Sequence, residues 1–315
     1  MVSVNEHVPV LVEESLDFLQ PERGGVYVDV TVGLGGHASR LLERAPSASL
    51  VGLDRDPEAL ELAARRLHPF GDRVRLVRSD YRRLREALAE VGHATVAGIL
   101  GDLGVSSLQL ERASRGFSFR REGPLDMRMG PDAARTARDV VNQYSEGELV
   151  RLLKDYGEER QARRIARAIV RERERAPLET TVELRDLIHR TVGVPPPHTR
   201  HRLGGIDSAT RTFQALRIEV NQELEGLETF LEQAISLLER DGRLVVISYQ
   251  SLEDRLVKCA LRQAALGEVD PVTGRKRAET RLIELMTRKP VRATEAEVVA
   301  NPRSRSARLR AARRI

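Results

Sequence analysis

The 315-residue sequence has no tryptophan, one cysteine (Cys259) and only 3% aromatic residues. A single cysteine excludes an internal disulfide and is typical of a protein in a reducing compartment. With so few rings, the core must consist mainly of Leu, Val, Ile and Ala. No apolar run approaches the ~20 residues that a membrane-spanning helix needs. The first residues, MVSVNEHVPV, lack the basic and apolar regions of a signal peptide. We therefore expect a soluble, cytoplasmic protein without a membrane partner.

Apolar residues make up 41% of the chain, enough for one large domain or two ordinary ones. The net charge of +5 is unevenly distributed. Residues 288–315 hold nine Lys and Arg against Glu295 and Glu297, which gives this segment +7 and leaves −2 for the rest. Such a basic arm suits a phosphate backbone. A solvated tail that aids solubility is the alternative.

The first hundred residues alternate between predicted strands and helices. The expected strands are 26–31, 50–53, 74–77 and 96–101, with helices at about 36–45, 57–67 and 82–91 between them. This alternation is typical of βαβ units and predicts a parallel sheet. We expect the next strand at 243–249.

From about residue 113 to 225 the pattern is helical and strongly charged. Ser145-x-x-Glu148 and Thr180-x-x-Glu183 resemble capping boxes that open helices. About 140 residues separate Asp102 from Arg243, far more than a crossover between strands needs. We therefore predict a discontinuous Rossmann-like domain (1–112 and 226–315) with an inserted all-helical substrate-recognition domain (113–225).

A glycine turn follows the first strand, in Asp29-Val-Thr-Val-Gly33-Leu-Gly35-Gly36-His37-Ala38. Gly-x-Gly after a strand allows a ligand to approach the backbone closely. Asp54, 21 residues beyond Gly33, is placed to accept hydrogen bonds from ribose hydroxyls. These features predict a nucleotide-like cofactor.

The glycines also fit a dinucleotide fingerprint, so a nicotinamide-dependent oxidoreductase is an alternative. Asp29 favours S-adenosylmethionine, because a carboxylate there suits a cationic methionine group and repels a pyrophosphate. Asp80-Tyr81, after the third strand, is placed to meet an adenine ring.

Longer blocks carry a more specific resemblance. They are His7-Val-Pro-Val-Leu, Gly101-Asp-Leu-Gly-Val-Ser-Ser107, Arg115-Gly-Phe-Ser-Phe119, Leu125-Asp-Met-Arg-Met129, Tyr156-Gly-Glu-Glu159, Thr212-Phe-Gln-Ala-Leu-Arg-Ile218, Ser251-Leu-Glu-Asp-Arg255 and Asn301-Pro-Arg-Ser-Arg-Ser306. In this order, over nearly the whole chain, the sequence resembles the bacterial 16S rRNA (cytosine-N4) methyltransferase H family.

The resemblance implies a class I S-adenosylmethionine-dependent methyltransferase that methylates the N4 atom of a decoding-centre cytidine in 16S rRNA of the small ribosomal subunit. The cofactor-binding positions that it implies are Gly35, Gly36, His37, Asp54, Tyr81, Asp102 and Gln109. The sequence departs from the family pattern where Tyr249-Gln250 replaces the usual Phe-His, and where Asp207-Ser-Ala-Thr-Arg211 replaces His-Pro-Ala-Thr-Arg. These departures affect expected substrate contacts and leave the cofactor positions intact.

For the reaction itself, Asp102 and the Leu103 carbonyl are the candidate acceptors for the amine protons of cytosine. The target base must leave its stack to be methylated, and Phe117, Phe119 and Tyr249 are candidate stacking partners. The alternative for the two phenylalanines is that they anchor the insertion to the core.

We expect Arg303, Arg305, Arg308 and Arg310 to contact RNA phosphates. We predict no metal: His198 and His201 have i, i+3 spacing but no third ligand nearby. An RNA-binding ribosome-assembly protein without turnover is a further alternative, and a homodimer is left open.

Overall fold

The computed structural model describes residues 8–194, 206–267 and 278–315. The chain divides into two compact units, one formed by Met1–Gly104 with Leu224–Ile315 and the other by Val105–Glu223. We call them the sheet unit and the helical unit. The boundaries expected from the sequence, after residues 112 and 225, lie eight and two residues beyond the observed ones. In the described ranges, no helix is both long and apolar enough to span a membrane.

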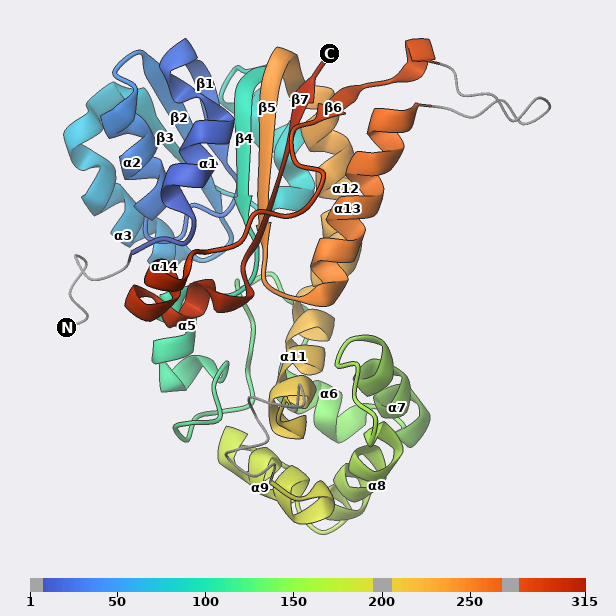
Figure 1. Cartoon of the computed structure of the whole chain (residues 1–315). Helices are drawn as coiled ribbons and strands as arrows, with labels where there is room; N and C mark the ends of the chain where they lie inside the picture. Colours follow the sequence, from blue (N-terminus) through green and yellow to red (C-terminus); the bar gives the residue numbers. More distant parts are fainter. Residues whose placement is uncertain (1–7, 195–205, 268–277) are drawn as a thin grey trace. The chain divides into compact units, whose positions relative to one another are not determined.

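The sheet unit contains a seven-stranded sheet of order β3-β2-β1-β4-β5-β7-β6 (Figure 1). The first five strands run parallel and β7 is antiparallel to both of its neighbours. Their bounds are β1 Gly25–Asp29, β2 Ala48–Asp54, β3 Val74–Arg78, β4 Val96–Asp102, β5 Leu238–Ser248, β6 Ile283–Leu285 and β7 Arg308–Arg314. The predicted Rossmann-like α/β sheet is confirmed.

Helices cover both faces of this sheet, as Figure 1 shows. One apolar cluster joins α1 (Val12–Leu19), α2 (Gly36–Arg44) and α3 (Pro57–Leu67) to the sheet through side chains such as Leu16, Leu41 and Leu67. A second cluster joins α4 (Leu84–Glu90), α12 (Glu223–Leu237) and α13 (Ser251–Leu266) to the other face. Because aliphatic side chains fill both clusters, the sheet is buried on both faces, as a parallel sheet requires.

The C-terminal segment differs from the free basic arm that the sequence suggested. Residues 288–315 contain the short helix α14 (Glu295–Ala300) and β7. β7 inserts between β5 and β6, with Leu309 and Ala311 buried in the apolar cluster of one face and Ala312 in that of the other. Burial of these apolar residues and pairing on both edges keep the arginine-rich segment in the sheet.

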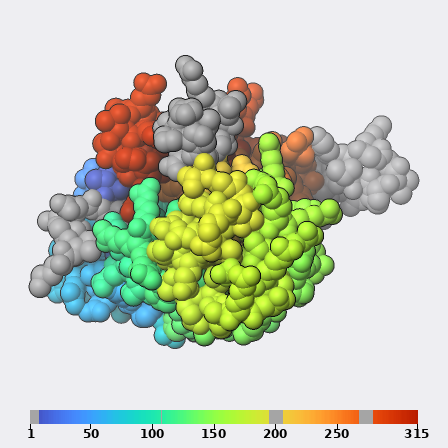
Figure 2. Space-filling view, turned by 90° about the horizontal axis from the view of Figure 1, so that it is seen from below, coloured from blue at the N-terminus to red at the C-terminus, as the bar shows by residue number. Residues whose placement is uncertain are grey.

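The helical unit consists of α5 (Ser107–Glu111), α6 (Ala137–Gln143), α7 (Glu146–Asp155), α8 (Ala162–Arg173), α9 (Thr181–Val192) and α11 (Ser208–Asn221). Its apolar core is its own and includes Val140, Leu153, Ile165, Ile188 and Leu216. The predicted capping boxes are confirmed, at Ser145 before α7 and at Thr180 before α9. Figure 2 shows the surface of this unit in green and yellow.

Candidate functional site

Three aspartates end three neighbouring strands of the sheet unit. Asp29 is the last residue of β1, Asp54 of β2 and Asp102 of β4. β1 lies between β2 and β4, so the three carboxyl ends meet at one edge of the sheet. Ligands of open α/β sheets bind outside this edge, where the strand order reverses.

The turn between β1 and α2 is bonded to Asp54. Gly33 and Gly35 have φ angles of +51° and +75°, which favour glycine because a Cβ would strain such a backbone. The Gly33 N–H donates to Oδ2 of Asp54 at 2.9 Å, and the Asp56 N–H donates to Oδ1 at 2.9 Å. Burial raises the pKa of Asp54 to about 6, even though these backbone donors oppose the shift.

Asp29 lies almost completely buried beneath the turn, with 2% of its surface exposed. Its Oδ1 accepts a hydrogen bond from the Thr31 N–H at 3.1 Å. Burial is the largest influence on its carboxyl group and raises its pKa to about 6, while nearby His37 lowers it. The Thr31 hydroxyl links two of the acids, since it donates to Asp29 Oδ1 and accepts from the Asp102 N–H at 2.7 Å.

Two side chains of the sheet unit lie beside the Asp102 carboxylate. The Tyr249 hydroxyl donates to Oδ1 at 2.8 Å, and Nδ1 of His37 lies 3.8 Å from Oδ2. Burial raises the pKa of Asp102 to about 7, and the hydrogen bond from Tyr249 lowers it. A carboxyl group with this pKa can both release and accept a proton at neutral pH.

His37 is buried and its protonation state follows from its contacts. Nε2 lies 2.9 Å from the Val10 carbonyl oxygen, which can only accept, so Nε2 carries the hydrogen. Burial lowers the pKa of His37, which favours the neutral imidazole. Nδ1 then presents a lone pair toward Asp102.

These residues fit the expected S-adenosylmethionine. In the described ranges, none of the three carboxylates, buried in Asp29 and half-buried in Asp54 and Asp102, has an ion pair with Lys or Arg. Asp80 differs, because Arg55 at 3.0 Å and Arg82 at 2.9 Å neutralise it. Buried acids without a cationic partner suit a ligand that brings its own positive charge and hydroxyl donors. A sulfonium, an ammonium and ribose hydroxyls have this chemistry.

Two further positions implied for the cofactor lie in different units. Tyr81 begins a short 3₁₀ turn after β3, and its ring packs edge-on against Phe230 with centroids 5.5 Å apart. Gln109 belongs to the helical unit, where its side chain accepts from the Ser106 N–H at 3.0 Å and completes the capping box of α5. The local role of Gln109 is therefore helix capping, and its contact with the cofactor stays a prediction.

The backbone at Tyr249 is fixed by a residue that the sequence reasoning missed. Glu253 is buried and accepts hydrogen bonds from the N–H groups of Tyr249 and Gln250, at 3.0 and 3.3 Å, and from the Gln250 amide at 2.9 Å. Glu253 is the third residue of α13, so the spacing of Gln250 and Glu253 was the available signal for a capping box. Gln250, where the family has His, thus serves to begin the helix.

The candidate stacking residues Phe117 and Phe119 both pack within the helical unit. Phe117 is 8% exposed in its core, and Phe119 makes an edge-on contact with Phe213 at 5.0 Å. A base cannot stack on a ring face that core side chains cover, so the packing alternative fits Phe117. The ring of Tyr249 is only partly buried, at the carboxyl end of β5.

The four arginines expected to contact phosphates fall into two pairs. Arg303 and Arg305 are exposed. Arg310 is 7% exposed and forms a two-pronged ion pair with Asp254, at 2.7 and 3.2 Å, and Arg308 lies 3.9 Å from the same carboxylate. The expectation for Arg310 is corrected: its charge is neutralised inside the sheet unit and is not presented to RNA.

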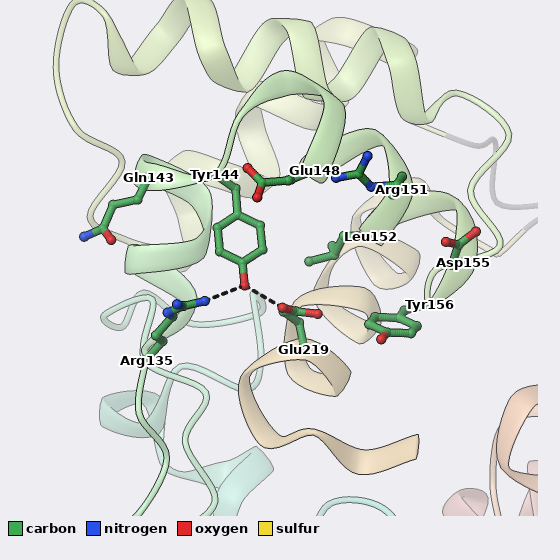
Figure 3. Close-up of a pocket in the computed structure, with 9 residues that line it drawn as sticks. All are labelled: Arg135, Gln143, Tyr144, Glu148, Arg151, Leu152, Asp155, Tyr156 and Glu219. Atoms are coloured by element: carbon green, nitrogen blue, oxygen red, sulfur yellow. Dashed lines mark hydrogen bonds between the residues drawn. The ribbon is translucent and has the colours of Figure 1, made fainter. Parts of the chain in front are cut away.

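A separate pocket of about 530 Å³ lies in the helical unit, between α6, α7 and α11 (Figure 3). The Tyr144 hydroxyl accepts from Arg135 at 3.0 Å and donates to Glu219. Basic and acidic side chains line it in similar numbers, so its charge does not favour an anion. His198 and His201 lie outside the described residues. In the described ranges, no three His, Cys, Asp or Glu side chains are grouped as a metal site requires.

Comparison with known proteins gives a consistent result. The chain is 49% identical to "Ribosomal RNA small subunit methyltransferase H" of Geotalea uraniireducens, over 98% of both chains. It is 50% identical to the protein of that name from Salinispora tropica, over 98% of this chain and 84% of the relative. The solved structure of a "putative rRNA-methylase" from Clostridium thermocellum aligns with a TM-score of 0.44 at 12% identity, over 98% of this chain and 100% of the other.

A family model matches residues 4–315, which is nearly the whole chain. The predicted family is therefore confirmed, and with it the predicted methyl donor, S-adenosylmethionine. The sheet that ends in three acids and the glycine turn beside it are thus parts of a methylase, and this chain belongs to the MraW methylase family.

Proposed function

We propose that this protein transfers a methyl group from S-adenosylmethionine to the N4 atom of a decoding-centre cytidine in 16S rRNA of the small ribosomal subunit. Support comes from the family, from relatives named "Ribosomal RNA small subunit methyltransferase H", and from the resemblance of the motifs. The observation that carries the chemistry is Asp102, a half-buried acid with a pKa raised to about 7 at the carboxyl end of β4.

The cofactor residues are proposed as follows. Asp54, which the Gly33 N–H holds in place, accepts from ribose hydroxyls, and Asp29 faces the cationic methionine part. Gly35, Gly36 and His37 form the turn beside it, and Tyr81 with Gln109 complete the set. When bound, S-adenosylmethionine supplies an electrophilic methyl group on a sulfonium.

The cytosine amine needs help because its lone pair is delocalised into the ring. We assign Asp102 and the Leu103 carbonyl as acceptors that hold the two N–H groups and aim the nitrogen. As nitrogen gains the methyl carbon and the sulfur–carbon bond breaks, one N–H proton passes to Asp102 and then to water. Positioning of this kind contributes up to roughly 7–11 kcal/mol in favourable systems.

The two oxygens of Asp102 allow a division of tasks. Oδ1 accepts a hydrogen bond from the Tyr249 hydroxyl, whereas Oδ2 lies 3.8 Å from Nδ1 of His37, which is too far for a hydrogen bond. Oδ2 can therefore accept a hydrogen bond from the cytosine amine. The side chain of Leu103 is buried in the apolar cluster, so only its backbone is available for the reaction.

The test is transfer of labelled methyl from S-adenosylmethionine to small subunits and to naked 16S rRNA, with the product nucleoside identified by mass spectrometry. We expect N4-methylcytidine, and Asp102→Ala should lose most of the turnover while still binding RNA. Methylation of a different atom would overturn the proposed specificity. Absence of transfer to every RNA form despite cofactor binding would point to an assembly factor. Near-normal turnover by Asp102→Ala would overturn the role of that residue.

A further inference from the structure

One face of α8 carries a row of arginines that the proposed chemistry does not use. Arg164, Arg167 and Arg171, followed by Arg175 just beyond the helix end, are spaced by three, four and four residues. At 3.6 residues per turn this spacing places them on one face. The other face buries Ile165 and Ile169 in the core of the unit. The row extends about 16 Å, from a rise of ~1.5 Å per residue.

These arginines line a groove of about 360 Å³ between α8 and α9. Leu187 and Thr191 form its α9 side, and Glu172 is its single acidic side chain. In the view of Figure 2, the yellow and yellow-green surface of α8 and α9 faces the reader. Four cations against one anion make the groove strongly positive.

The charges of this row are not used to hold the fold together. In the part of the chain that the structure describes, the side chains of Arg171 and Arg175 have no hydrogen bond or ion pair. Arg167 lies 3.7 Å from Glu146, but the two side chains are 61% and 44% exposed, so water screens the pair. Buried Arg310 differs, since Asp254 neutralises it.

Arg164 is held in place at the rim of the groove. Its guanidinium donates to the Gln161 side chain at 2.6 Å and to the Thr191 carbonyl at 2.7 Å. Neither partner is charged, so the positive charge remains available to a ligand. A fixed guanidinium loses less conformational entropy when it binds an anion.

We propose that the arginine row on α8, comprising Arg164, Arg167, Arg171 and Arg175, binds the phosphate backbone of the RNA substrate. This proposal rests on the proposed function for the identity of the RNA. Guanidinium groups match phosphate oxygens in geometry and charge.

The lining of the groove favours a nucleic acid over an acidic protein. Protein interfaces are centred on aromatic and apolar anchors. This groove has no aromatic side chain, and its apolar members, Ala168 and Leu187, are small or buried. Charge without an apolar centre is typical of contacts that position a phosphate backbone.

The experiment compares Arg167→Gln/Arg171→Gln with Lys258→Gln/Arg262→Gln. Both pairs are exposed cations spaced i, i+4 on a helix, and the second pair lies on α13 of the sheet unit. Gln has nearly the helix propensity of Arg and Lys, so both variants should keep their helices, which circular dichroism checks. Binding to 16S rRNA is measured over a range of salt concentrations, together with S-adenosylmethionine affinity and methyl-transfer kinetics.

For Arg167→Gln/Arg171→Gln we expect the slope of log K against log salt to become shallower by about 1.4 to 1.8, since each of the two phosphate contacts contributes roughly 0.7–0.9. KM for RNA should rise, with kcat and cofactor affinity unchanged. The α13 variant should keep the wild-type slope and KM.

An unchanged slope in the α8 variant, or an equal change in both variants, would overturn the proposal. Binding of polyglutamate that only the α8 variant loses, with RNA binding intact, would assign the groove to an acidic protein instead. The two proposals fail separately: absence of methyl transfer by the wild-type protein refutes the proposed function, while the salt dependence of its RNA binding still tests the arginine row.

Discussion

At the scale of single residues, the pair Tyr249 and Asp102 controls when the proposed acceptor is ionised. Burial raises the pKa of Asp102 to about 7 and the Tyr249 hydroxyl, 2.8 Å from Oδ1, lowers it. A hydrogen bond to a charged group is worth ~1.5–3 kcal/mol, which corresponds to about one to two pH units. Tyrosine at a position where the family usually has phenylalanine therefore keeps more of Asp102 ionised near pH 7.

We predict that Tyr249→Phe shifts the acid limb of the pH–rate profile for methyl transfer to higher pH. Asp102 must be ionised to accept a proton, so activity rises as pH increases through its pKa. Loss of the Tyr249 hydroxyl raises that pKa further and moves the limb up by about one unit or more. Single-turnover rates between pH 5.5 and 9 measure the shift.

The matched control is Tyr27→Phe, because the Tyr27 hydroxyl donates to the Gln20 carbonyl, away from the three acids. Its pH profile should follow the wild type. An unmoved limb in Tyr249→Phe would show that Tyr249 does not act through Asp102, and a stacking role for its ring would then be favoured.

Cofactor binding should depend on pH through Asp54 and Asp29, whose pKa values burial raises to about 6. Ribose hydroxyls and a cationic methionine group favour ionised carboxylates, so bound cofactor lowers both pKa values. Affinity is then greatest above pH 6 and falls as pH drops below it, with protons released on binding.

Calorimetry at pH 6 in two buffers of different ionisation enthalpy measures this proton release. Asp54→Asn should release fewer protons and bind more weakly, whereas Asp80→Asn, which changes an acid already paired with Arg55 and Arg82, should keep the wild-type proton count. Equal release by wild type and Asp54→Asn would contradict the assignment of Asp54.

At the scale of elements, the sequence predicts β1, β2 and β4 well because each is rich in aliphatic residues and ends in an acid. The acids at their ends were therefore identifiable as site residues, and the structure brings Asp29, Asp54 and Asp102 to one edge of the sheet. Capping boxes could be predicted equally well from the sequence, because they depend on side chains only three residues apart.

β7 could not be predicted in the same way. Its sequence, Arg-Leu-Arg-Ala-Ala-Arg-Arg, has the composition of a solvated tail. Its place in the sheet depends on Asp254, 56 residues from Arg310, and on pairing with β5. Neither of these contacts can be predicted from the local sequence pattern. The hydrogen bond between Tyr249 and Asp102 was unpredictable for the same reason, since it joins residues 147 positions apart.

We predict that Asp254→Asn destabilises the protein by about 3–5 kcal/mol, because it leaves the buried Arg310 guanidinium without a compensating charge. The double variant Asp254→Leu/Arg310→Met should recover most of that loss, since it removes both charges. Urea unfolding followed by circular dichroism measures both.

Arg305→Gln, at an exposed position, serves as the control and should change stability by less than ~0.5 kcal/mol. An unfolding midpoint of Asp254→Asn equal to wild type would show that this ion pair does not hold β7.

At the scale of the whole molecule, each of the two units has an apolar core made of its own side chains. Clusters on both faces of the sheet draw only on residues before 105 or after 223, and the cluster of the helical unit lies within 105–223. Independent cores imply that each unit can fold without the other. The glycine turn and the three acids all belong to the sheet unit, whereas Gln109 and the arginine row belong to the helical unit.

We therefore predict that replacing residues 105–223 with a flexible Gly-Ser linker leaves a folded sheet unit that binds S-adenosylmethionine. This excised protein should not transfer methyl groups, and its binding to 16S rRNA should lose the wild-type salt dependence. Gln109→Ala in the full chain separates two reasons for any loss of cofactor affinity. If Gln109 contacts the cofactor, Gln109→Ala and the excised protein should weaken binding by a similar factor. Wild-type affinity in both would confine the cofactor site to the sheet unit. Failure of the excised protein to unfold cooperatively would show instead that the sheet needs the insertion to fold.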